Sequence, residues 1–196
     1  MNKDYSVVKG LYVTLRLLGP KDASMTLKWR SSNRARFLNR GAISVEDQKK
    51  WIESRPSSEF NYIIEIDGGV PVGTISLIGI DPVNKHAEPS RFLIGEPESV
   101  KGLPIAVESI SLIYKLAFDD LGLRRVYGTI AETNTLMIKW QKYLGLKEEG
   151  RLRDHYFING EWQDAVCLGM LEDEYRSVCV QRVQALLSMQ QKVASI

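Results

Sequence analysis

The sequence is short of the residues that most often hold metal ions. Its 196 residues include two cysteines and two histidines. Cys167 and Cys179 are twelve positions apart, which matches no metal-ligand spacing. With His86 and His155 as the remaining ligands, a zinc site is not expected. We therefore predict no metal centre and two buried, inert thiols.

A large excess of one charge and a long hydrophobic run are also missing. The net charge is +2, from 26 basic and 24 acidic residues, which is too small to favour a nucleic-acid partner. No apolar run approaches the roughly 20 residues that cross a bilayer. The first ten residues lack the apolar core of a signal peptide. We therefore expect a cytoplasmic protein without a membrane partner, and the length fits one domain.

Strand and helix patterns alternate along the chain. Two glycine-containing turns, "DGG" and "NGE", predict β-hairpins. Runs rich in β-branched and aromatic residues predict strands at 11–18, 62–66, 70–77, 91–95, 124–131, 151–158 and 162–170. Apolar periodicity and capping residues predict helices at 21–31, 105–120, 134–145 and 172–192. A further helix is predicted to begin at the capping box of Ser44.

The order of these elements predicts the fold class. A strand, a helix and a second strand over residues 91–131 imply a parallel pair with a right-handed crossover. Hairpins elsewhere make the sheet mixed. We predict an α+β fold, with a central mixed sheet of about six or seven strands flanked by helices. Residues 1–171 would form the domain, and residues 172–196 a helical extension packed on it or on a partner subunit.

The stretch "VKGLPIAVES", residues 100–109, begins a long apolar helix with no acidic residue before Glu108. The free N–H groups and the dipole of a helix start attract anions, phosphate above all. Gly102 would let a ligand approach the backbone closely, and Lys101 adds a positive charge. Alternatively, Gly102 and Pro104 only turn the chain, with Pro104 at the first helical position.

Several segments, in this order along the chain, resemble the GCN5-related N-acetyltransferases. They include "VTLRLLGPKDA", "PVGTISLIGID", "LAFDDLGLRRVYGTIAETN" and, as the most specific, "LGLKEEGRLRDHYFINGEWQD". The most similar branch holds ribosomal-protein N-terminal acetyltransferases and amino-sugar-nucleotide acetyltransferases. The resemblance ends near residue 176. It implies the acyl-CoA N-acyltransferase fold and acetyl-coenzyme A as the acyl donor.

The resemblance also implies where the coenzyme binds. The family's pyrophosphate loop, Gln/Arg-x-x-Gly-x-Gly/Ala, falls on residues 101–106. Its expected coenzyme-binding residues are Lys101, Gly102, Leu103, Ile105 and Ala106. Lys101 replaces Gln or Arg, and Pro104 replaces glycine and removes one N–H donor.

Further coenzyme contacts are implied on the strand before that loop and on the helix at 134–145. The pantetheine arm would pair with the backbone from Phe92 through Leu93 to Ile94. Asn134 matches the family asparagine that contacts the coenzyme near the thioester.

The chemistry of acetyl transfer requires a neutral amine, because only the neutral amine attacks a thioester carbonyl. Glu88 is the expected base, directly or through water, since it lies on or just before the central strand. Alternatively, Glu88 is an exposed carboxylate at a strand end. A backbone N–H on the strand that carries the pantetheine would stabilise the oxyanion.

The departing thiolate would benefit from a nearby general acid. The family often uses a tyrosine four residues before the glycine that ends the helix at 134–145, and that position here is Gln141. Tyr143 is the nearest alternative, although two residues turn a helix by about 200°. The thiolate would otherwise leave without a side-chain acid.

The acceptor pocket is expected between the first two helices, the loop that joins them and the last hairpin. Its candidate residues are Trp29, Arg30, Arg36 and Arg40. Arginine binds carboxylates and phosphates through its planar fork, and aromatic faces stack on flat rings. Four arginines between positions 30 and 40 favour an anionic acceptor over a polyamine. Alternatively, the segment is a solvated basic face with core tryptophans, or it binds a protein N-terminus.

Together these features predict an acetyl-CoA-dependent N-acetyltransferase. The acceptor would be the primary amine of an amino-sugar nucleotide or of a protein or peptide N-terminus, attacking directly in a ternary complex. The apolar stripe of the last helix is compatible with a homodimer. Gln141 and Pro104 favour the alternative, a non-catalytic acyl-CoA-binding or regulatory module of the same fold.

Overall fold

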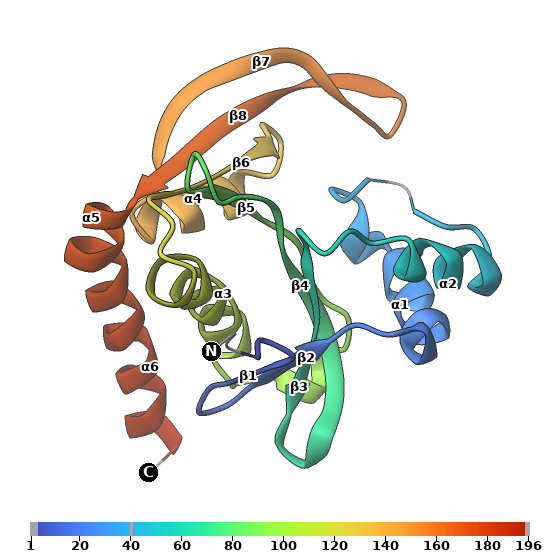
Figure 1. The fold of residues 1–196 in the computed structure, drawn as a ribbon, viewed down its shortest axis with the longest axis horizontal. Helices are drawn as coiled ribbons and strands as arrows, with labels where there is room; N and C mark the ends of the chain where they lie inside the picture. Colours follow the sequence, from blue (N-terminus) through green and yellow to red (C-terminus); the bar gives the residue numbers. More distant parts are fainter. Residues whose placement is uncertain (1–3, 40, 195–196) are drawn as a thin grey trace.

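The computed structural model describes residues 4–39 and 41–194, which form one mixed sheet with helices on both faces (Figure 1). The strands in the described residues are β1 (Val7–Lys9), β2 (Thr14–Leu17), β3 (Phe60–Ile66), β4 (Val70–Asp81), β5 (His86–Ile94), β6 (Arg125–Ala131), β7 (Lys147–Ile158) and β8 (Glu161–Leu171). They lie in the order β1-β2-β3-β4-β5-β6-β8-β7. β5 and β6 are parallel, and the other neighbouring pairs are antiparallel.

The helices lie where the sequence predicts them. Their bounds are α1 (Ala23–Arg30), α2 (Val45–Glu53), α3 (Ile105–Lys115), α4 (Thr135–Tyr143), α5 (Glu172–Glu174) and α6 (Val180–Ala194). A π-helical turn, Leu116–Asp120, continues α3, and a second one, Tyr175–Cys179, joins α5 to α6. In the part of the chain that the structure describes, no helix has the length and hydrophobicity needed to cross a membrane.

The mixed sheet and the parallel β5–β6 pair are confirmed, but the strand count was too low. The eighth strand is β1, three residues that pair with β2. A segment of three residues is too short to show the period-two pattern by which strands are recognised. Both predicted hairpin turns are confirmed, and positive φ angles occur at Gly68, Gly69, Asn159 and Gly160.

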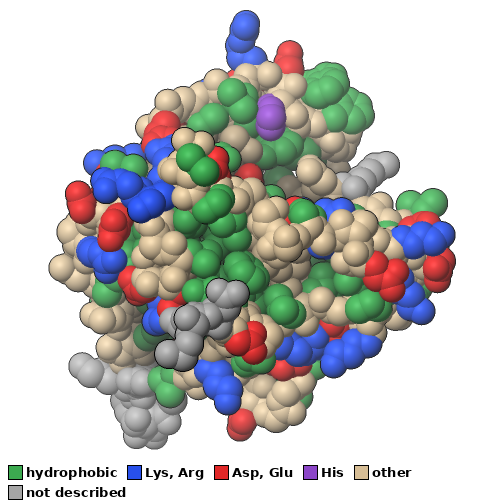
Figure 2. Space-filling model, viewed as in Figure 1, with side chains coloured by type: hydrophobic (Ala, Val, Ile, Leu, Met, Phe, Trp, Pro, Cys, Tyr) green, Lys and Arg blue, Asp and Glu red, His purple; other side chains and the backbone are tan. Residues whose placement is uncertain are grey.

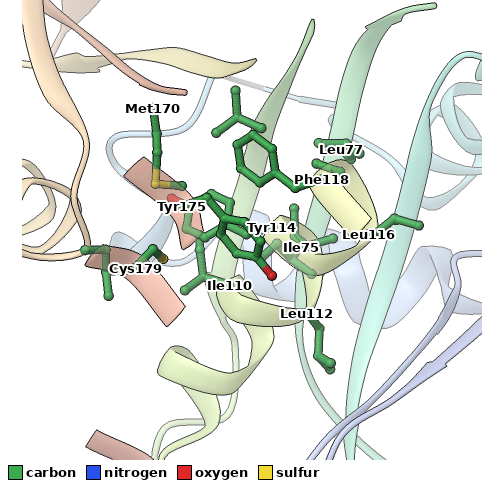
Figure 3. Close-up of a cluster of buried hydrophobic side chains, with 14 of the residues drawn as sticks. Ile75, Leu77, Ile110, Leu112, Tyr114, Leu116, Phe118, Met170, Tyr175 and Cys179 are labelled. Atoms are coloured by element: carbon green, nitrogen blue, oxygen red, sulfur yellow. The ribbon is translucent and has the colours of Figure 1, made fainter. Parts of the chain in front are cut away.

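The larger hydrophobic core lies between the sheet and α3 with the C-terminal helices (Figure 3). The rings of Phe118 and Tyr175 stack with centroids 4.6 Å apart, so the C-terminal segment packs on the end of α3. Cys179 is buried there, and burial raises the pKa of its thiol to about 12. Cys167 is only half-buried, so the prediction of two buried thiols is correct for Cys179 alone. The homodimer stays a prediction.

The smaller core lies on the opposite face of the sheet, under α1 and α2 (Figure 1). Trp29 of α1 is 2% exposed and packs with Ala35, Ile63 and Leu93. Its indole Nε1 donates to Glu96 Oε1 at 2.8 Å, just beyond the end of β5. This core therefore ties α1 to β3 and β5.

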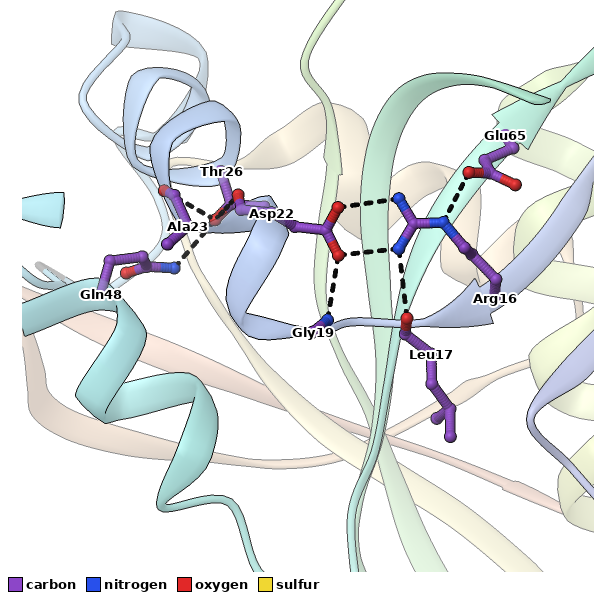
Figure 4. A network of polar contacts seen from close by, with 8 residues as sticks. All are labelled: Arg16, Leu17, Gly19, Asp22, Ala23, Thr26, Gln48 and Glu65. Carbon is purple, nitrogen blue, oxygen red and sulfur yellow. Dashed lines mark hydrogen bonds and ion pairs between the residues drawn. The ribbon is translucent and has the colours of Figure 1, made fainter. Parts of the chain in front are cut away.

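A partly buried ion pair fixes the start of α1 against the sheet (Figure 4). Arg16 of β2 donates to both carboxylate oxygens of Asp22, at 2.7 and 2.8 Å, and to Glu65 of β3 at 2.6 Å. The backbone N–H of Gly19 also donates to Asp22, at 2.9 Å. Burial alone would raise the pKa of Asp22, but the Arg16 and Gly19 hydrogen bonds hold it below its usual range.

We expect Asp22→Asn to destabilise the protein by about 2–3 kcal/mol at pH 7, because it leaves Arg16 with a broken pair in a partly buried site. An ionised Asp22 stabilises the fold above its unfolded pKa of about 3.9, and this contribution is lost as the pH falls through the lower folded pKa. Urea unfolding at pH 7 and below pH 4 measures the difference. Asp173→Asn, at an exposed position of α5, is the control; equal effects of the two variants would contradict this account.

Candidate active site

The parallel strands β5 and β6 meet over only two residue pairs. His86 pairs with Arg125 and Ala87 with Val126, and beyond these pairs the strands diverge. β5 stays bonded to β4 as far as Ile94, and β6 to β8 as far as Ala131. The backbone groups along the facing edges beyond Ala87 and Val126 are therefore not paired with each other. An extended chain with amide groups can bond to such an edge.

A β-bulge lies in β5 just beyond the point of divergence. Ser76 and Thr74 of β4 pair with Ser90 and Leu93, so β5 has one extra residue between these pairs. Arg91 has a φ of 52°, which costs a residue other than glycine about 1–3 kcal/mol. Thr74 Oγ1 donates to the Arg91 carbonyl oxygen at 3.0 Å. A bulge bends its strand and increases the local twist, so it helps to carry β5 away from β6.

Of the three residues expected along the pantetheine, Phe92 belongs to this bulge, and Leu93 and Ile94 lie past it. Leu93 is 5% exposed and belongs to the smaller core. Phe92 and Ile94 pack against the larger core, and the Phe92 ring lies 6.0 Å from that of Trp140 on α4. Their side chains are thus used for packing, and their backbone edge toward β6 is what remains for a ligand.

The start of α3 has the free N–H groups that the phosphate hypothesis requires. Pro104 is the N-cap, and Glu108 N–H is the first to bond within the helix, to the Pro104 carbonyl oxygen at 3.0 Å. The amides of Ile105, Ala106 and residue 107 therefore precede the first intrahelical bond. Pro104 lies one position before the first helical residue, so its missing N–H leaves these three donors in place. Gly102 has a φ of 80°, and no atom lies within 4 Å of the position of an added Cβ.

Glu108 does not place its charge at the helix start. The residue is 4% exposed, and its carboxylate accepts hydrogen bonds from the N–H groups of Leu11, Tyr12 and Val13 at 2.7–2.8 Å. These bonds tie the β1–β2 loop to α3. The amides at the helix start therefore stay without an acidic neighbour, as the sequence pattern predicts.

Glu88 lies on β5 directly after the last residue paired with β6. It is half-buried and opposes Ile78 of β4. Its Cγ and Oε1 lie 3.5 and 3.8 Å from the position of a Cβ on Gly128 of β6, so the side chain reaches the opposite strand. Burial raises the pKa of Glu88, although the Arg91 charge and a hydrogen bond from Ser90 oppose this shift. A raised pKa brings a carboxylate closer to the range of a general base.

The three residues of α4 that the sequence analysis considered lie in different environments. Asn134 is the half-buried N-cap, and its side chain does not bond to the helix backbone. Gln141 is buried and accepts a hydrogen bond from Tyr114 of α3 at 2.5 Å. Tyr143 is 45% exposed, and Arg182 of α6 covers its ring at 5.1 Å. No contact of the described residues joins Tyr143 to Glu88, and the structure does not favour Tyr143 as the acid.

A cavity of about 780 Å³ lies between the α1–α2 loop and the β7–β8 hairpin, where the acceptor pocket is expected. Its lining residues are Arg30, Ser31, Ser32, Asn33, Ala35, Arg36, Phe37, Leu38, Asn39, His155, Tyr156, Phe157, Ile158, Asn159 and Gly160. None of these described residues is acidic. Figure 1 shows the hairpin arching over the body of the molecule, and Figure 2 shows hydrophobic side chains gathered near the middle of one face.

The structure places only some of the predicted acceptor residues in the cavity wall. Arg30 and Arg36 line the cavity. Trp29 is buried in the smaller core, so its ring is not available for stacking on a ligand. Arg40 lies outside the described residues. Burial lowers the pKa of Arg30, and the positive charge of Arg91 adds to this effect.

The sequence did not identify the aromatic residues of the hairpin that line the cavity. Tyr156 forms a hydrogen bond with Thr129 of β6 at 2.7 Å. Burial raises the pKa of Tyr156, the Thr129 bond opposes this, and the negative charge of Glu88 raises it further. Tyr156 therefore lies near Glu88 as well as in the cavity wall. The "NG" turn could have indicated which hairpin residues reach the cavity, but not the register shift between Leu152 and Tyr156.

Two features of this site suit an extended carrier molecule. The free edges of β5 and β6 can bind an arm that contains amide groups, and the unbonded amides at the start of α3 can bind a diphosphate. A family model described as "Acetyltransferase (GNAT) domain" matches residues 13–147, more than half of the chain, so the protein belongs to the GNAT acetyltransferase family. It is an N-acetyltransferase, and its acyl donor is acetyl-coenzyme A.

Known proteins support this family. The chain is 29% identical over 174 residues to "Putative ribosomal N-acetyltransferase YdaF" of Bacillus subtilis, covering 84% of this chain and 93% of that protein. It is 28% identical over 118 residues to spermidine N(1)-acetyltransferase of Escherichia coli, covering 60% and 61%. A solved structure described as "Crystal structure of putative acetyltransferase" superimposes with a TM-score of 0.78 at 25% identity, covering 95% of this chain and all of that one. Spermidine N-acetyltransferase from Vibrio cholerae in complex with CoA and spermine shares the fold, with a TM-score of 0.75 at 24% identity, covering 85% and 99%.

We expect Gly102→Asp to raise the KM for acetyl-CoA at least about tenfold, because a carboxylate would repel the diphosphate at the helix start. Gly68→Asp in the β3–β4 turn is a matched control, since Gly68 has a φ of 76° and an equally open surrounding. Initial rates with varied acetyl-CoA measure the effect. An unchanged KM in Gly102→Asp, or an equal rise in Gly68→Asp, would remove the assignment.

We expect Glu88→Gln to lower kcat about 100-fold at neutral pH and less at high pH, where the amine is already neutral. In the wild type, the acid limb of kcat/KM should report the raised pKa of Glu88. Glu46→Gln, at an exposed position of α2, should leave the pH profile unchanged. Equal losses in Glu88→Gln at every pH would assign Glu88 a structural role instead.

Proposed function

We propose that the enzyme acetylates a primary amine on an anionic acceptor, with an amino-sugar nucleotide as the leading candidate. The composition of the cavity wall supports this proposal most directly. Arg30 and Arg36 contribute two guanidinium groups, and none of the described lining residues is Asp or Glu. The planar fork of arginine suits phosphate and carboxylate groups.

The same charges disfavour a polyamine acceptor. A polyamine is a polycation near neutral pH, and a wall with arginines and no carboxylate repels it. The similarity to spermidine N(1)-acetyltransferase of Escherichia coli covers 61% of that protein, whereas the Bacillus subtilis relative is covered over 93%. The spermidine enzyme of Vibrio cholerae is covered over 99% of its length in structure, but at 24% identity this likeness supports the fold and not the acceptor.

A protein or peptide N-terminus is the second candidate. The name of the Bacillus subtilis relative points to a ribosomal acceptor, and the match to it covers 84% of this chain. A cavity of about 780 Å³ has room for a few residues, and acidic side chains near the N-terminus would meet the same arginines.

In the proposed mechanism, the acceptor amine approaches from the cavity and loses its proton to Glu88, directly or through water. The β5 edge past Ala87 binds the pantetheine arm, and the amides at the start of α3 bind the diphosphate. The amine nitrogen bonds to the thioester carbonyl carbon, and a backbone N–H of β5 stabilises the oxyanion. Collapse of this intermediate breaks the carbon–sulfur bond, and the extra proton that the nitrogen still carries passes to the departing thiolate, directly or through water, so that the products are the amide and the free thiol of coenzyme A. Asn134 would lie beside the thioester.

A panel of amines tests the acceptor class. Thiol release should be fastest with an amino-sugar nucleotide, slower with an acidic peptide bearing a free N-terminus, and slowest with spermidine. Arg30→Gln and Arg36→Gln should each raise the KM for the anionic acceptor about tenfold, since a charge-assisted hydrogen bond contributes about 1.5–3 kcal/mol. The KM for acetyl-CoA should stay unchanged.

Lys49→Gln on the exposed part of α2 is the control for loss of one positive charge. Spermidine as the best acceptor, or equal KM changes in Lys49→Gln and Arg36→Gln, would contradict the anionic acceptor. Binding of coenzyme A without turnover on any amine would favour the non-catalytic module instead.

A further inference from the structure

The bulged residue of β5, Arg91, is held at both its backbone and its side chain. Its Nη1 donates to Glu59 Oε2 and Asn61 Oδ1, each at 2.8 Å. Its guanidinium carbon lies 5.3 Å from the centroid of the Trp51 ring on α2. Thr74 Oγ1 binds its carbonyl oxygen. Contacts from α2, β4 and the start of β3 thus fix a residue whose backbone is strained.

The partners of Arg91 are themselves held in place. Asn61 is 7% exposed, accepts a hydrogen bond from Ser76 at 2.8 Å and donates to Glu59 at 3.2 Å. Burial alone would raise the pKa of Glu59, but hydrogen bonds from Arg91 and Asn61 and the charge of Arg55 hold it below its usual range. Glu59 therefore stays ionised at neutral pH and keeps its pairing with Arg91.

Arg91 also lies between two groups of the proposed reaction. Its positive charge acts on Glu88, three residues earlier on β5, and on Arg30 in the cavity wall. Glu88 marks the divergence of β5 from β6, and Arg30 belongs to the acceptor cavity. Arg91 therefore occupies the junction between the splayed strands and this cavity.

We propose that Arg91 is a positioning residue for acetyl transfer: anchored on Glu59 and Asn61, it holds the bulge that turns β5 from β6 and keeps a positive charge beside Glu88. The inference rests on the proposed role of Glu88 as the base. Without the anchor, the strained conformation of residue 91 has less to maintain it, and the bend of β5 relaxes. A displacement of about 1 Å at a reacting group can cost about 100-fold in rate.

The comparison of Arg91→Gln with Arg55→Gln tests this role. Arg55 is a matched control because it covers the same Trp51 ring at 4.6 Å and lies 3.9 Å from the same Glu59, but it is not on β5. We expect Arg91→Gln to lower kcat about 10- to 100-fold. Arg55→Gln should stay within about twofold of the wild type, since Arg55 touches neither β5 nor Glu88 and its pair with Glu59 is long, at 3.9 Å. The Kd of coenzyme A, measured by calorimetry, should be unchanged in Arg55→Gln and should rise in Arg91→Gln, because the pantetheine arm binds the edge of β5 that the bulge bends.

Two further variants separate positioning from general damage to the fold. Glu59→Gln removes the charged anchor but leaves Arg91 in the chain, and it should lower kcat in the same direction. Arg91→Lys keeps a positive charge without the planar fork, and it should recover part of the lost kcat. Melting curves show whether each variant is folded at the assay temperature.

The pH profile gives a readout that a purely structural defect would not change. The groups that face Glu88 are Arg91 and Ser90 on β5 and Tyr156 on β7, while Ile78 of β4 and Gly128 of β6 bring no charge. Loss of the Arg91 charge favours the neutral form of Glu88. The acid limb of kcat/KM should therefore move to higher pH in Arg91→Gln and stay in place in Arg55→Gln and Arg91→Lys.

The proposal is overturned by a kcat of Arg91→Gln within about twofold of the wild type. Equal losses in Arg91→Gln and Arg55→Gln, or an acid limb that does not move in Arg91→Gln, would overturn it as well. The role of Glu88 fails separately, if Glu88→Gln keeps the wild-type kcat while Arg91→Gln loses it.

Discussion

Two backbone pairs, His86 with Arg125 and Ala87 with Val126, are the parallel pairing that joins the two halves of the sheet. On one side β1 to β5 form an antiparallel unit, and on the other β6, β8 and β7 form a second one. Each half is stabilised by its own ladder, so the strands can part beyond Ala87 without loss of either unit. Glu88 and the β5 edge proposed to bind the pantetheine arm lie along this opening.

Acidic residues near the opening are bound to partners that keep most of them away from the ligand sites. Glu108 accepts hydrogen bonds from three N–H groups of the β1–β2 loop, so its carboxylate does not offset the positive end of the helix dipole at the start of α3. Glu59 is paired with Arg91. Glu88 is the carboxylate at the divergence itself, and burial there raises its pKa. The distribution of charge therefore suits a diphosphate at the start of α3, a base at Glu88 and an anionic acceptor in the cavity between the α1–α2 loop and the β7–β8 hairpin.

Local patterns predicted most of the fold, because turns and strand–helix–strand order depend on near neighbours in the sequence. The "DGG" and "NGE" turns and the crossover over residues 91–131 are of this kind. The three-residue strand β1 has too little pattern to be recognised. The bulge at Arg91 and the extent of β5–β6 pairing depend on register between distant segments, which one sequence does not state.

The sequence predicted the parts of the candidate site that are formed by backbone groups better than the parts that are formed by side chains. Gly102 and the amides after it follow from the helix start alone. Trp29 was expected to bind the acceptor because aromatic faces stack on flat rings, yet its ring lies in the smaller core, about 100° around the helix from Arg30. Tyr156 and Arg91 escaped notice because each acts through partners far away in the sequence, Thr129 and Glu59.

The most direct test of the central claim is amide hydrogen exchange with and without coenzyme A. If the opening holds the pantetheine arm and the helix start holds the diphosphate, bound coenzyme A should slow exchange in β5 beyond Ala87 and over residues 102–107. Amides of the β7–β8 turn should exchange as before. Saturated binding that leaves both of the first two segments unprotected would contradict the account.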